Sequence, residues 1–560
     1  MQPSKQTARA RPTTAAWIAP LALVAATIAV YWGVWRFEFV NFDDAIALSG
    51  DASAVLDDDG GVHLPDRGLA AILEFERGRE YLPVRDASYA IDRTLFGGAR
   101  PGGFHLTNLV IHIVSGLVFV RLAAALGVAA PASFLAGALF LLHPIQTESI
   151  AWIAGRKDLL AAAFALASWL AYARERRAAS AALFLAAALS KATVVALPLA
   201  FITADLANAA SRRANSRISI RAAVARAAPH LAISTLVAAI ALATSRGAGM
   251  LRSGGDRGAI ESLLLACKLP FLYAANIAWP ARLHLLYSPA LPSPGDPASW
   301  LAPLALLAVI ALMVAIARTR PLAAAGAAAF LLLLLPTLGL VPFQILMADR
   351  YAYLPLAGVA LAAAALWPAR WSAERARVPV AIAACALVAV LAPAARREAS
   401  AWRNSETLWT REIARDANHA DAWMNLGTHY LSQSRARAAR GDTLASRDRA
   451  RLAAEKLERA AHLNPSAVGT RVNWALAAAL AGDHVTALRA IELATSLEPR
   501  NPLVLYNSAC VRARVGDIDG AIGDLARAID CGFAEKERLE SDPDLEPLRA
   551  DARFQNLKLR

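Results

Sequence analysis

Cysteine, methionine and charged residues are all scarce in this sequence. Among 560 residues there are four cysteines and five methionines, and charged residues make up 18%. Neither cysteine nor histidine recurs at the spacing of a metal site, so the sequence indicates no metal site of cysteine or histidine ligands. Cys510 and Cys531 are 21 residues apart within a helical repeat, and we expect no disulfide between them.

Hydrophobic residues make up 57% of the chain, and they come in blocks that end near residue 394. Most blocks are about as long as the ~20 residues that a helix needs to cross a bilayer. We expect ten to twelve spans, at 15–35, 105–126, 131–151, 158–173, 178–204, 229–245, 262–281, 300–317, 321–342, 350–367 and 378–394. Ser190 and Lys191 interrupt the fifth block, which predicts a bent pair of short helices. Lys268 and Pro270 interrupt the seventh, which could only dip into the membrane.

The net charge of +13 lies in the membrane part, because residues 396–560 hold 25 basic and 23 acidic side chains. Much of the excess falls in short loops between the blocks, as positive-inside topology predicts, and a nucleic-acid partner is not indicated. This rule predicts a cytoplasmic tail at 1–14 and an extracytoplasmic C-terminal domain. The loop at 36–104 is then extracytoplasmic, with helical stretches expected near 68–80 and 83–97.

Residues 396–560 repeat with a period of 34. Pro465 and Pro499 are 34 residues apart, and so are Asn473 and Asn507. The residues Trp423, Leu426, Gly427 and Tyr430 fit the first helix of a tetratricopeptide repeat. We therefore expect an all-α chain: a polytopic membrane domain at 15–395, then a tetratricopeptide solenoid at 396–560. About three repeats and a half repeat fit, with an Arg-rich insertion near 435–448.

Ionisable residues gather at the ends of the spans on the outer side. Asp43 and Asp44 follow the first span, where a carboxylate could be a general base or a solvated loop acid. Arg156, Lys157, Lys191 and Arg350 together would suit a lipid-linked phosphate, although Arg156 and Lys157 could instead be snorkelling interfacial residues. The further candidates for binding the substrate are Arg85, His105, His143, Glu148 and Tyr353.

Several strings resemble the bacterial relatives of the transmembrane and tetratricopeptide-repeat O-mannosyltransferases. They are Arg85-Asp-Ala-Ser-Tyr89, Gly103-Phe-His-Leu-Thr-Asn108, His143-Pro-Ile-Gln-Thr-Glu148 with Gly155-Arg-Lys-Asp158, Ser190-Lys191, Asp349-Arg-Tyr-Ala-Tyr353 and Trp402-Arg-Asn-Ser-Glu-Thr-Leu-Trp409. The resemblance implies the multi-span fold of the family C glycosyltransferases. It also implies a polyprenyl-phosphate-hexose donor and an acidic motif at Asp43 and Asp44, with Asp43 favoured as the base. Many relatives carry an acid after Ser190-Lys191, where this chain has Ala192.

The function implied by this resemblance is transfer of a mannose-like hexose, with inversion, to an extracytoplasmic hydroxyl. The membrane would be a bacterial inner membrane, with the repeats in the periplasm binding a protein or glycan acceptor. No cofactor is required, and a divalent metal is possible but not indicated. A non-catalytic scaffold whose repeats recruit envelope proteins is the alternative. A flippase would need polar residues in mid-span, whereas they concentrate here at the span ends.

Overall fold

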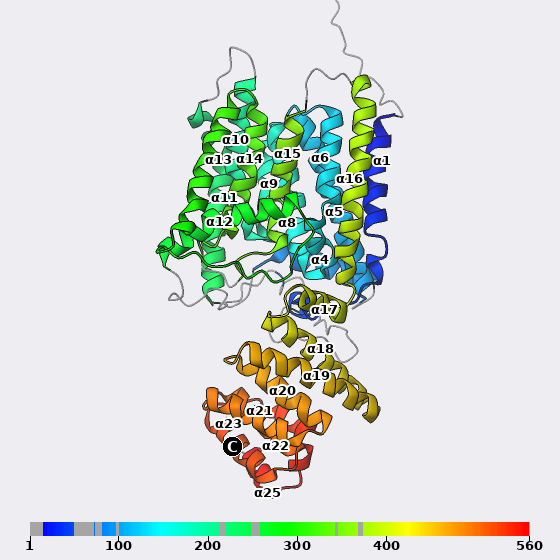
Figure 1. Cartoon of the computed structure of the whole chain (residues 1–560), viewed down its shortest axis with the longest axis vertical. Helices are drawn as coiled ribbons and strands as arrows, with labels where there is room; N and C mark the ends of the chain where they lie inside the picture. The colour runs from blue at the N-terminus through cyan, green and yellow to red at the C-terminus, as the bar shows by residue number, and fades with distance from the viewer. Residues whose placement is uncertain are drawn as a thin grey trace, which may run out of the picture. The chain divides into compact units, whose positions relative to one another are not determined.

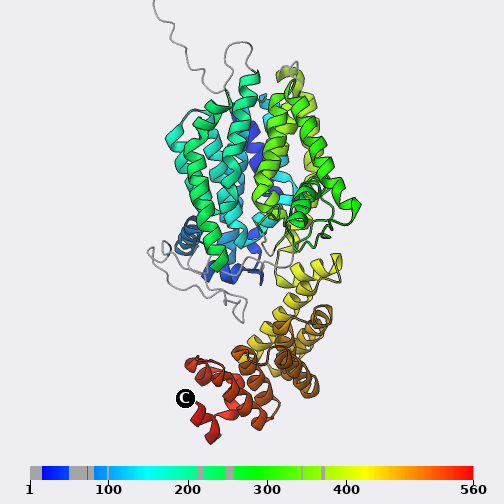
Figure 2. The ribbon, with the colours of Figure 1, turned by 90° about the vertical axis from the view of Figure 1, so that its left-hand side faces the viewer.

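The structure is a computed structural model that describes residues 15–49, 72, 81–96, 100–211, 219–247, 258–341, 345–367 and 373–558. Every regular element within these residues is a helix, which confirms the predicted fold class. The chain forms two compact units (Figures 1 and 2). The membrane unit comprises Met1–Phe37 and Leu64–Arg403, and the C-terminal unit comprises Glu38–His63 and Asn404–Arg560.

The membrane unit is a bundle of apolar helices (Figure 1). Among the described residues, seven stretches are long and apolar enough to cross a membrane: Ala19–Arg36, Pro101–Ala125, Ala192–Ala209, Ile220–Thr244, Ala259–Ala278, Pro297–Ala317 and Val378–Ala401. They correspond to α1 (Ala15–Val30) with η1 (Val34–Arg36), α5 (Pro101–Ala125), α10 (Leu197–Ser211), α11 (Ile220–Gly247), α12 (Ala259–Ala278), α13 (Leu301–Ala317) and α16 (Ala373–Ala401). The shorter helices are α6 (Ala130–Leu142), α8 (Arg156–Ala173), α9 (Arg177–Ser190), α14 (Pro321–Leu334) and α15 (Pro355–Ala365). The protein is therefore a multi-pass membrane protein.

The span predicted over 131–151 is wrong, because helix α6 ends at Leu142. His143 is extended, with φ −69° and ψ 129°, as expected for a residue before proline. Three short elements follow: η2 (Pro144–Gln146), α7 (Thr147–Ala151) and η3 (Ile153–Gly155). The bend predicted at Lys191 is confirmed, since α9 ends at Ser190 and η4 (Ala192–Ala196) leads into α10. These interruptions place polar backbone and side chains inside the unit.

Two glycines hold α14 and α15 close together. A Cβ added to Gly358 of α15 would lie 2.5 Å from the backbone nitrogen of Phe330, and one added to Gly326 would lie 2.5 Å from that of Ala362. Side chains at these positions would force the helices apart. This close pair fixes the two turns that flank it, η6 (Leu335–Thr337) and η7 (Asp349–Ala352).

Helix α4 (Pro83–Phe96) confirms the helix predicted near 83–97, whereas the stretch predicted near 68–80 lies outside the described residues, except for residue 72. Helix α12 runs without interruption from Ala259 to Ala278, through Lys268 and Pro270. A long segment then leads through η5 (Pro297–Trp300) into α13, and buries Leu283 and Leu285 in the unit.

The C-terminal unit is a row of antiparallel helix pairs (Figure 2). It comprises α2 (Asp44–Ser49), α17 (Ser405–Arg415), the pairs α18 (Ala420–Ala439) with α19 (Thr443–Leu463), α20 (Val468–Ala481) with α21 (His484–Leu497), and α22 (Pro502–Arg514) with α23 (Ile518–Asp530), then α24 (Lys536–Ser541), η8 (Pro543–Leu548) and α25 (Ala552–Lys558). The last three cover the end of the row by burying Leu539, Leu545 and Phe554 against α22 and α23.

The turns within the pairs repeat the sequence period. Gly482 and Gly516 are left-handed, with φ 85° and 87°, and the aspartates that follow them, Asp483 and Asp517, cap the second helices. The Arg-rich insertion near 435–448 does not form a loop. It lengthens both helices of the first pair, which have 20 and 21 residues where the second pair has 14 and 14.

Candidate functional site

Two motifs about 200 residues apart are joined by hydrogen bonds in the membrane unit. The Glu148 carboxylate accepts from the backbone N–H of Arg350 at 2.8 Å and forms an ion pair with the Arg350 guanidinium. The Gln146 side chain donates to the carbonyl oxygens of Phe140 and Tyr353, each at 3.3 Å. Because Pro144 breaks the helix, η2 and α7 can present these side chains to the turn η7. These contacts therefore hold the two motifs against each other.

A small pocket lies beside the ion pair of Glu148 and Arg350. Its lining includes Asp158 of α8, Lys191 at the bend, and Arg350, Tyr351 and Tyr353 from η7 and the residue after it. The Lys191 ammonium forms an ion pair with the Asp158 Oδ1, while the Asp158 Oδ2 is buried and has no hydrogen-bond partner among the described residues. The pocket is a cavity of about 20 Å³. Asp158 is paired with Lys191, and Glu148 is paired with Arg350.

Cationic side chains outnumber carboxylates around this pocket. Lys191 lies within electrostatic reach of Lys157, Arg350 and Asp158, and Arg350 lies within reach of Glu148. The Arg350 guanidinium carbon also lies 5.2 Å above the Trp152 ring and 5.3 Å above the Tyr351 ring. Of the charged side chains that line the pocket itself, Lys191 and Arg350 are cations and Asp158 is a carboxylate.

The neighbouring cation, Arg156, faces a different set of residues. Its Nη1 pairs with Asp92 at 2.5 Å, its Nε donates to the Asn108 Oδ1 at 2.8 Å, and its Nη2 donates to the Phe104 carbonyl at 2.7 Å. The side chain is fully buried and lies 4.8 Å from the centre of the Tyr89 ring. Arg156 therefore ties α8 to α4 and α5, and it does not line the pocket.

The other predicted binding residues are divided between the pocket and its surroundings. Tyr353 lines the pocket, and its hydroxyl donates to the Nδ1 of His112 at 2.7 Å, because the His112 Nε2 faces the Leu141 carbonyl at 3.0 Å. His143 accepts from the backbone of Ile145 and faces the Ile277 carbonyl at 2.9 Å, as a helix cap would.

Two further predicted residues, Arg85 and His105, are buried outside the pocket lining. Arg85 pairs with its neighbour Asp86 at 2.8 Å, and the His105 ring lies 5.8 Å from the Phe37 ring. Neither therefore reaches the pocket in this structure.

The two adjacent acids, Asp43 and Asp44, are in the C-terminal unit and differ in their surroundings. Asp44 is 1% exposed, and its Oδ2 accepts from the backbone N–H of Val40 at 2.9 Å. Asp43 is exposed and has a left-handed backbone with φ 61°, which aspartate tolerates better than most residues. Asp44 therefore stabilises the turn, while Asp43 presents its carboxylate to the surroundings.

The sequence analysis did not single out Asp158, Tyr351 or Tyr287. Tyr287 comes from the long segment after α12, and its hydroxyl donates to the Asp349 Oδ1 at 2.7 Å and accepts from the Asn276 Nδ2 at 2.7 Å. Asp158 and Tyr351 stand inside motifs that the sequence analysis quoted, so their place in a motif was the available signal. Tyr287 lies outside the quoted motifs, and only the fold brings it to Asp349.

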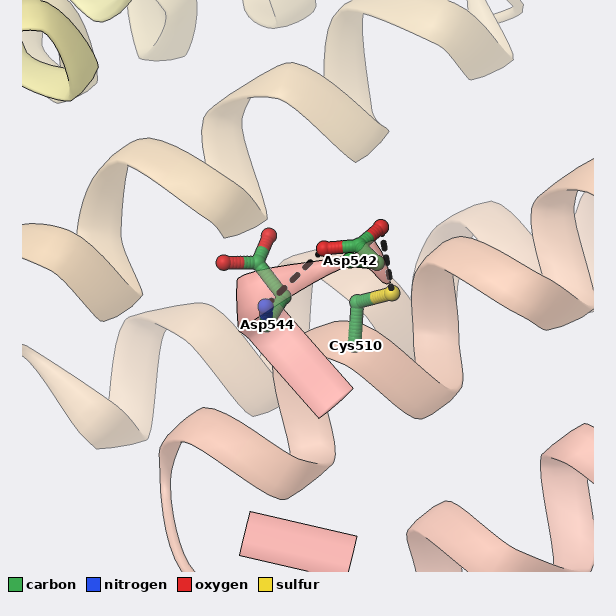
Figure 3. Close-up of side chains that lie close together, drawn as sticks. All are labelled: Cys510, Asp542 and Asp544. Carbon is green, nitrogen blue, oxygen red and sulfur yellow. Dashed lines mark hydrogen bonds between the residues drawn. The ribbon is translucent and has the colours of Figure 1, made fainter. Parts of the chain in front are cut away.

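A cluster in the C-terminal unit has the composition of a metal site. One possible ligand atom from each of Cys510, Asp542 and Asp544 lies within 4.8 Å of the others (Figure 3). The Asp542 carboxylate, however, accepts from the Tyr506 hydroxyl at 2.6 Å and from the backbone N–H of Asp544, and Asp544 pairs with Arg514. Burial, with the two carboxylates, raises the pKa of the Cys510 thiol, which keeps its proton. The cluster therefore fits a structural junction better than a metal site.

Comparison with known proteins finds relatives among the TMTC protein O-mannosyl-transferases. No protein-family model matches the chain. Protein O-mannosyl-transferase Tmtc2 of Drosophila melanogaster is 40% identical over 95 residues, which are 17% of this chain and 10% of that protein. Protein O-mannosyl-transferase TMTC4 of Homo sapiens is 35% identical over 112 residues (18% and 15%), and TMTC3 of Homo sapiens is 29% identical over 164 (28% and 17%). The matches span less than a fifth of these relatives. Over these stretches, the chain is a relative of the TMTC protein O-mannosyl-transferases.

Proposed function

We propose that this protein is a membrane glycosyltransferase that transfers a mannose-like hexose from a polyprenyl-phosphate donor to an acceptor hydroxyl. The observation that carries the proposal is the pocket in which Lys191 and Arg350 are each held by a carboxylate. The relatives, which are named protein O-mannosyl-transferases, support the same class of reaction.

The donor's phosphate is proposed to bind at Lys191 and Arg350, with Lys157 nearby. In the present structure Asp158 and Glu148 neutralise these cations, so an incoming phosphate would replace carboxylate contacts with phosphate contacts. The guanidinium of Arg350 can bind two phosphate oxygens, and Lys191 supplies a compact charge. Positive charge here would stabilise the leaving polyprenyl phosphate, which gains charge as its bond to the sugar breaks.

The proposed base is the exposed carboxylate of Asp43. It would take the proton of the acceptor hydroxyl while the oxygen forms a bond to the anomeric carbon of the hexose. The bond from that carbon to the phosphate oxygen breaks, and its electron pair leaves with polyprenyl phosphate, so the configuration is inverted. Asp44 would hold the turn through its hydrogen bond to Val40. The scheme requires no metal or cofactor.

The C-terminal helix pairs are proposed to be tetratricopeptide repeats that bind the acceptor or a partner. Their support is the 34-residue period and the recurrence of Gly482 and Gly516 with the caps that follow them. The charge of the loops supports a cytoplasmic N-terminus and an extracytoplasmic repeat domain. The proposed location is the inner membrane of a bacterium.

A non-catalytic scaffold remains the second candidate, and the small size of the pocket favours it. With Lys191 and Arg350 both paired, the cavity has a volume of about 20 Å³, which is enough for about one water molecule. The enzyme proposal therefore requires the pocket to open for a phosphate, whereas a scaffold requires no opening.

Binding of a short-chain polyprenyl phosphate to the purified protein in detergent separates the two candidates. Lys191→Gln is expected to weaken binding by roughly 10- to 100-fold, because it removes a charge-assisted hydrogen bond. Arg318→Gln, at the exposed end of α13, is the matched control and should bind normally. The variant Lys191→Gln/Asp158→Asn keeps the site free of an unpaired carboxylate and should still bind weakly. Absence of binding by the unmodified protein would favour the scaffold.

A further inference from the structure

The closed end of the first helix pair, where a turn joins α18 to α19, projects beyond the pair that follows it. Helices α18 and α19 have 20 and 21 residues, whereas α20 and α21 have 14 each. The other ends of the pairs are aligned, because Leu463 and Leu497, which end α19 and α21, are 34 residues apart. The extra residues therefore lie at the closed end, which projects by about 9–10 Å at 1.5 Å per residue (Figure 1). We call residues 435–451 the hairpin tip.

Small side chains pack the two helices of the hairpin tip against each other. Ala436 and Ala450 are buried, and the Ser434 Oγ donates to the Ser446 carbonyl oxygen at 2.9 Å. Gly441, with φ 80°, forms the turn between the helices. Because alanine and serine fill the contact between the helices, the arginines of the tip lie on its outside, where they are exposed or half-buried.

The hairpin tip is strongly basic. It contains six arginines and two aspartates, and no lysine or glutamate, so its net charge is +4. Three of the arginines each contact a carboxylate or an aromatic ring. The other three form no ion pair with any described residue, and they are Arg437, Arg440 and Arg447. The tip therefore presents three unpaired guanidinium groups around its turn.

An apolar side chain stands among these arginines. Leu444 is the second residue of α19, directly after the turn, and it is 76% exposed. Val485 has the corresponding position in α21 and is 80% exposed, but the turn before it, at 481–484, contains no arginine. The hairpin tip thus differs from the neighbouring turn by combining an exposed leucine with unpaired cations. This combination is typical of helices that bind at the interface of an anionic membrane.

We propose that the hairpin tip binds the surface of a bilayer that contains anionic phospholipids. Arg437, Arg440 and Arg447 contact lipid phosphates, and Leu444 enters the interface between headgroups and acyl chains. The leucine favours a bilayer over an acidic protein or polymer, since either of these would pair with the arginines but offer Leu444 no apolar medium. The membrane unit also keeps the chain in a bilayer, so headgroups are present at high effective concentration. The proposal applies equally to a transferase and to a scaffold.

Charge and apolar burial contribute separately to this binding. Each arginine close to an anionic surface strengthens binding about fivefold, so the three unpaired arginines together contribute roughly 100-fold. Burial of the Leu444 side chain contributes about tenfold or more. Salt weakens the contribution of the arginines, because it screens charges beyond ~10 Å at 0.1 M, and leaves that of the leucine. The C-terminal unit would thus have a second attachment to the bilayer, in addition to the polypeptide link at 403–404.

The test measures how closely the hairpin tip approaches lipid in the full-length protein reconstituted in nanodiscs. A fluorophore is attached at Thr443→Cys, in a chain whose Cys267, Cys385 and Cys531 are replaced by alanine, and its quenching by lipid with a nitroxide headgroup is recorded. Discs of phosphatidylcholine alone are compared with discs that contain an equal amount of phosphatidylglycerol. The label should be quenched in the anionic discs, and less at high salt. His484→Cys is the matched label position, because it begins α21 as Thr443 begins α19, and it should be quenched less.

Two variants separate the contributions of charge and leucine, each with a matched control. The charge variant is Arg437→Gln/Arg440→Gln/Arg447→Gln, and its control is Arg459→Gln/Arg489→Gln/Arg500→Gln, which removes three exposed arginines elsewhere in the C-terminal unit. The charge variant should lower the binding constant obtained from the quenched fraction roughly 100-fold, and its control should leave it unchanged. Leu444→Ser should lower it about tenfold, and Val485→Ser should not.

Equal quenching of the tip label in the two kinds of disc would overturn the proposal, and so would equal quenching of the charge variant and its control. Polyglutamate is added as a competitor in a last measurement. Loss of quenching to polyglutamate, together with full quenching in Leu444→Ser, would show that charge acts alone and would identify an acidic partner in place of the bilayer. Because the assay contains no sugar donor, its outcome is independent of hexose transfer.

Discussion

Replacing Arg350 by methionine is expected to destabilise the membrane unit strongly. Arg350 and Glu148 are each 5% exposed, and their side chains form an ion pair. The backbone N–H of Arg350 also donates a hydrogen bond to the Glu148 carboxylate. Removing one partner of such a pair leaves an unpaired buried charge, which costs ~3–5 kcal/mol. This is a large part of the ~5–15 kcal/mol by which a folded protein is stable. The thermal midpoint should therefore fall by about 10 °C.

The double variant Glu148→Gln/Arg350→Met separates stability from binding. It removes both charges, and glutamine keeps an oxygen that can accept the backbone N–H of residue 350. Replacing both members of a buried pair is often close to neutral, so most of the lost stability should return. Hexose transfer should stay absent, because the cation that we assign to the donor phosphate is missing.

The assay measures the thermal midpoint in detergent for Glu148→Gln, Arg350→Met and the double variant. Size-exclusion chromatography of the heated samples follows. A coupling free energy of at least ~2 kcal/mol between the two positions is expected. A double variant whose loss of stability equals the sum of the single losses would refute the pairing. A double variant that transfers hexose at the unmodified rate would remove Arg350 from donor binding.

Three further outcomes are expected. Gly358→Ala should lower the yield and thermal midpoint of the folded protein, because its Cβ would lie 2.5 Å from a backbone nitrogen of α14; Gly295→Ala, where the nearest atom is 3.9 Å away, should not. Burial lowers the pKa of His429, so below pH ~6.5 the unfolded chain binds a proton that the folded chain lacks. The stability of α18, measured by hydrogen exchange, should therefore decrease as the pH is lowered below ~6.5, by up to ~1.4 kcal/mol per pH unit. The decrease should be smaller in His429→Gln. Maleimide should label the exposed Cys531 and spare Cys510, whose thiol pKa is raised by burial and two carboxylates; labelling of Cys510 would contradict its buried position.

The sequence predicted the elements whose signals are local. Apolar blocks, the bend at Lys191 and the helix near 83–97 follow from residues that are neighbours in the chain. The break after Leu142 was missed, although Pro144 carries the signal, because the apolar run continues through Ile145 and hides the proline.

Pairings between distant residues were beyond the sequence. Glu148 meets Arg350 across 202 residues, and only the packing of α7 against η7 joins them. Adjacent residues were also grouped too readily. Successive helix residues point about 100° apart, and residues two positions apart point to nearly opposite sides. Arg156 therefore turns toward α4 and α5 while Asp158 faces the pocket. Likewise Asp43 is exposed and Asp44 is buried, although they are neighbours.

The repeat period predicted paired helices in the C-terminal unit and an Arg-rich insertion near 435–448, but not the structure of that insertion. In the structure α18 continues to Ala439 and α19 begins at Thr443. Arginine and alanine favour helix, so the added residues extend both helices.

The most direct test of the central proposal is transfer of radiolabelled hexose from polyprenyl-phosphate-hexose by the protein reconstituted in lipid vesicles. Asp43→Asn and Asp44→Asn are compared with the unmodified protein at equal insertion. The account predicts that Asp43→Asn abolishes transfer without weakening the binding of polyprenyl phosphate, and that Asp44→Asn retains part of the rate. Transfer by Asp43→Asn at the unmodified rate would contradict the assignment of the base. No transfer by the unmodified protein from any hexose donor would contradict the proposed function.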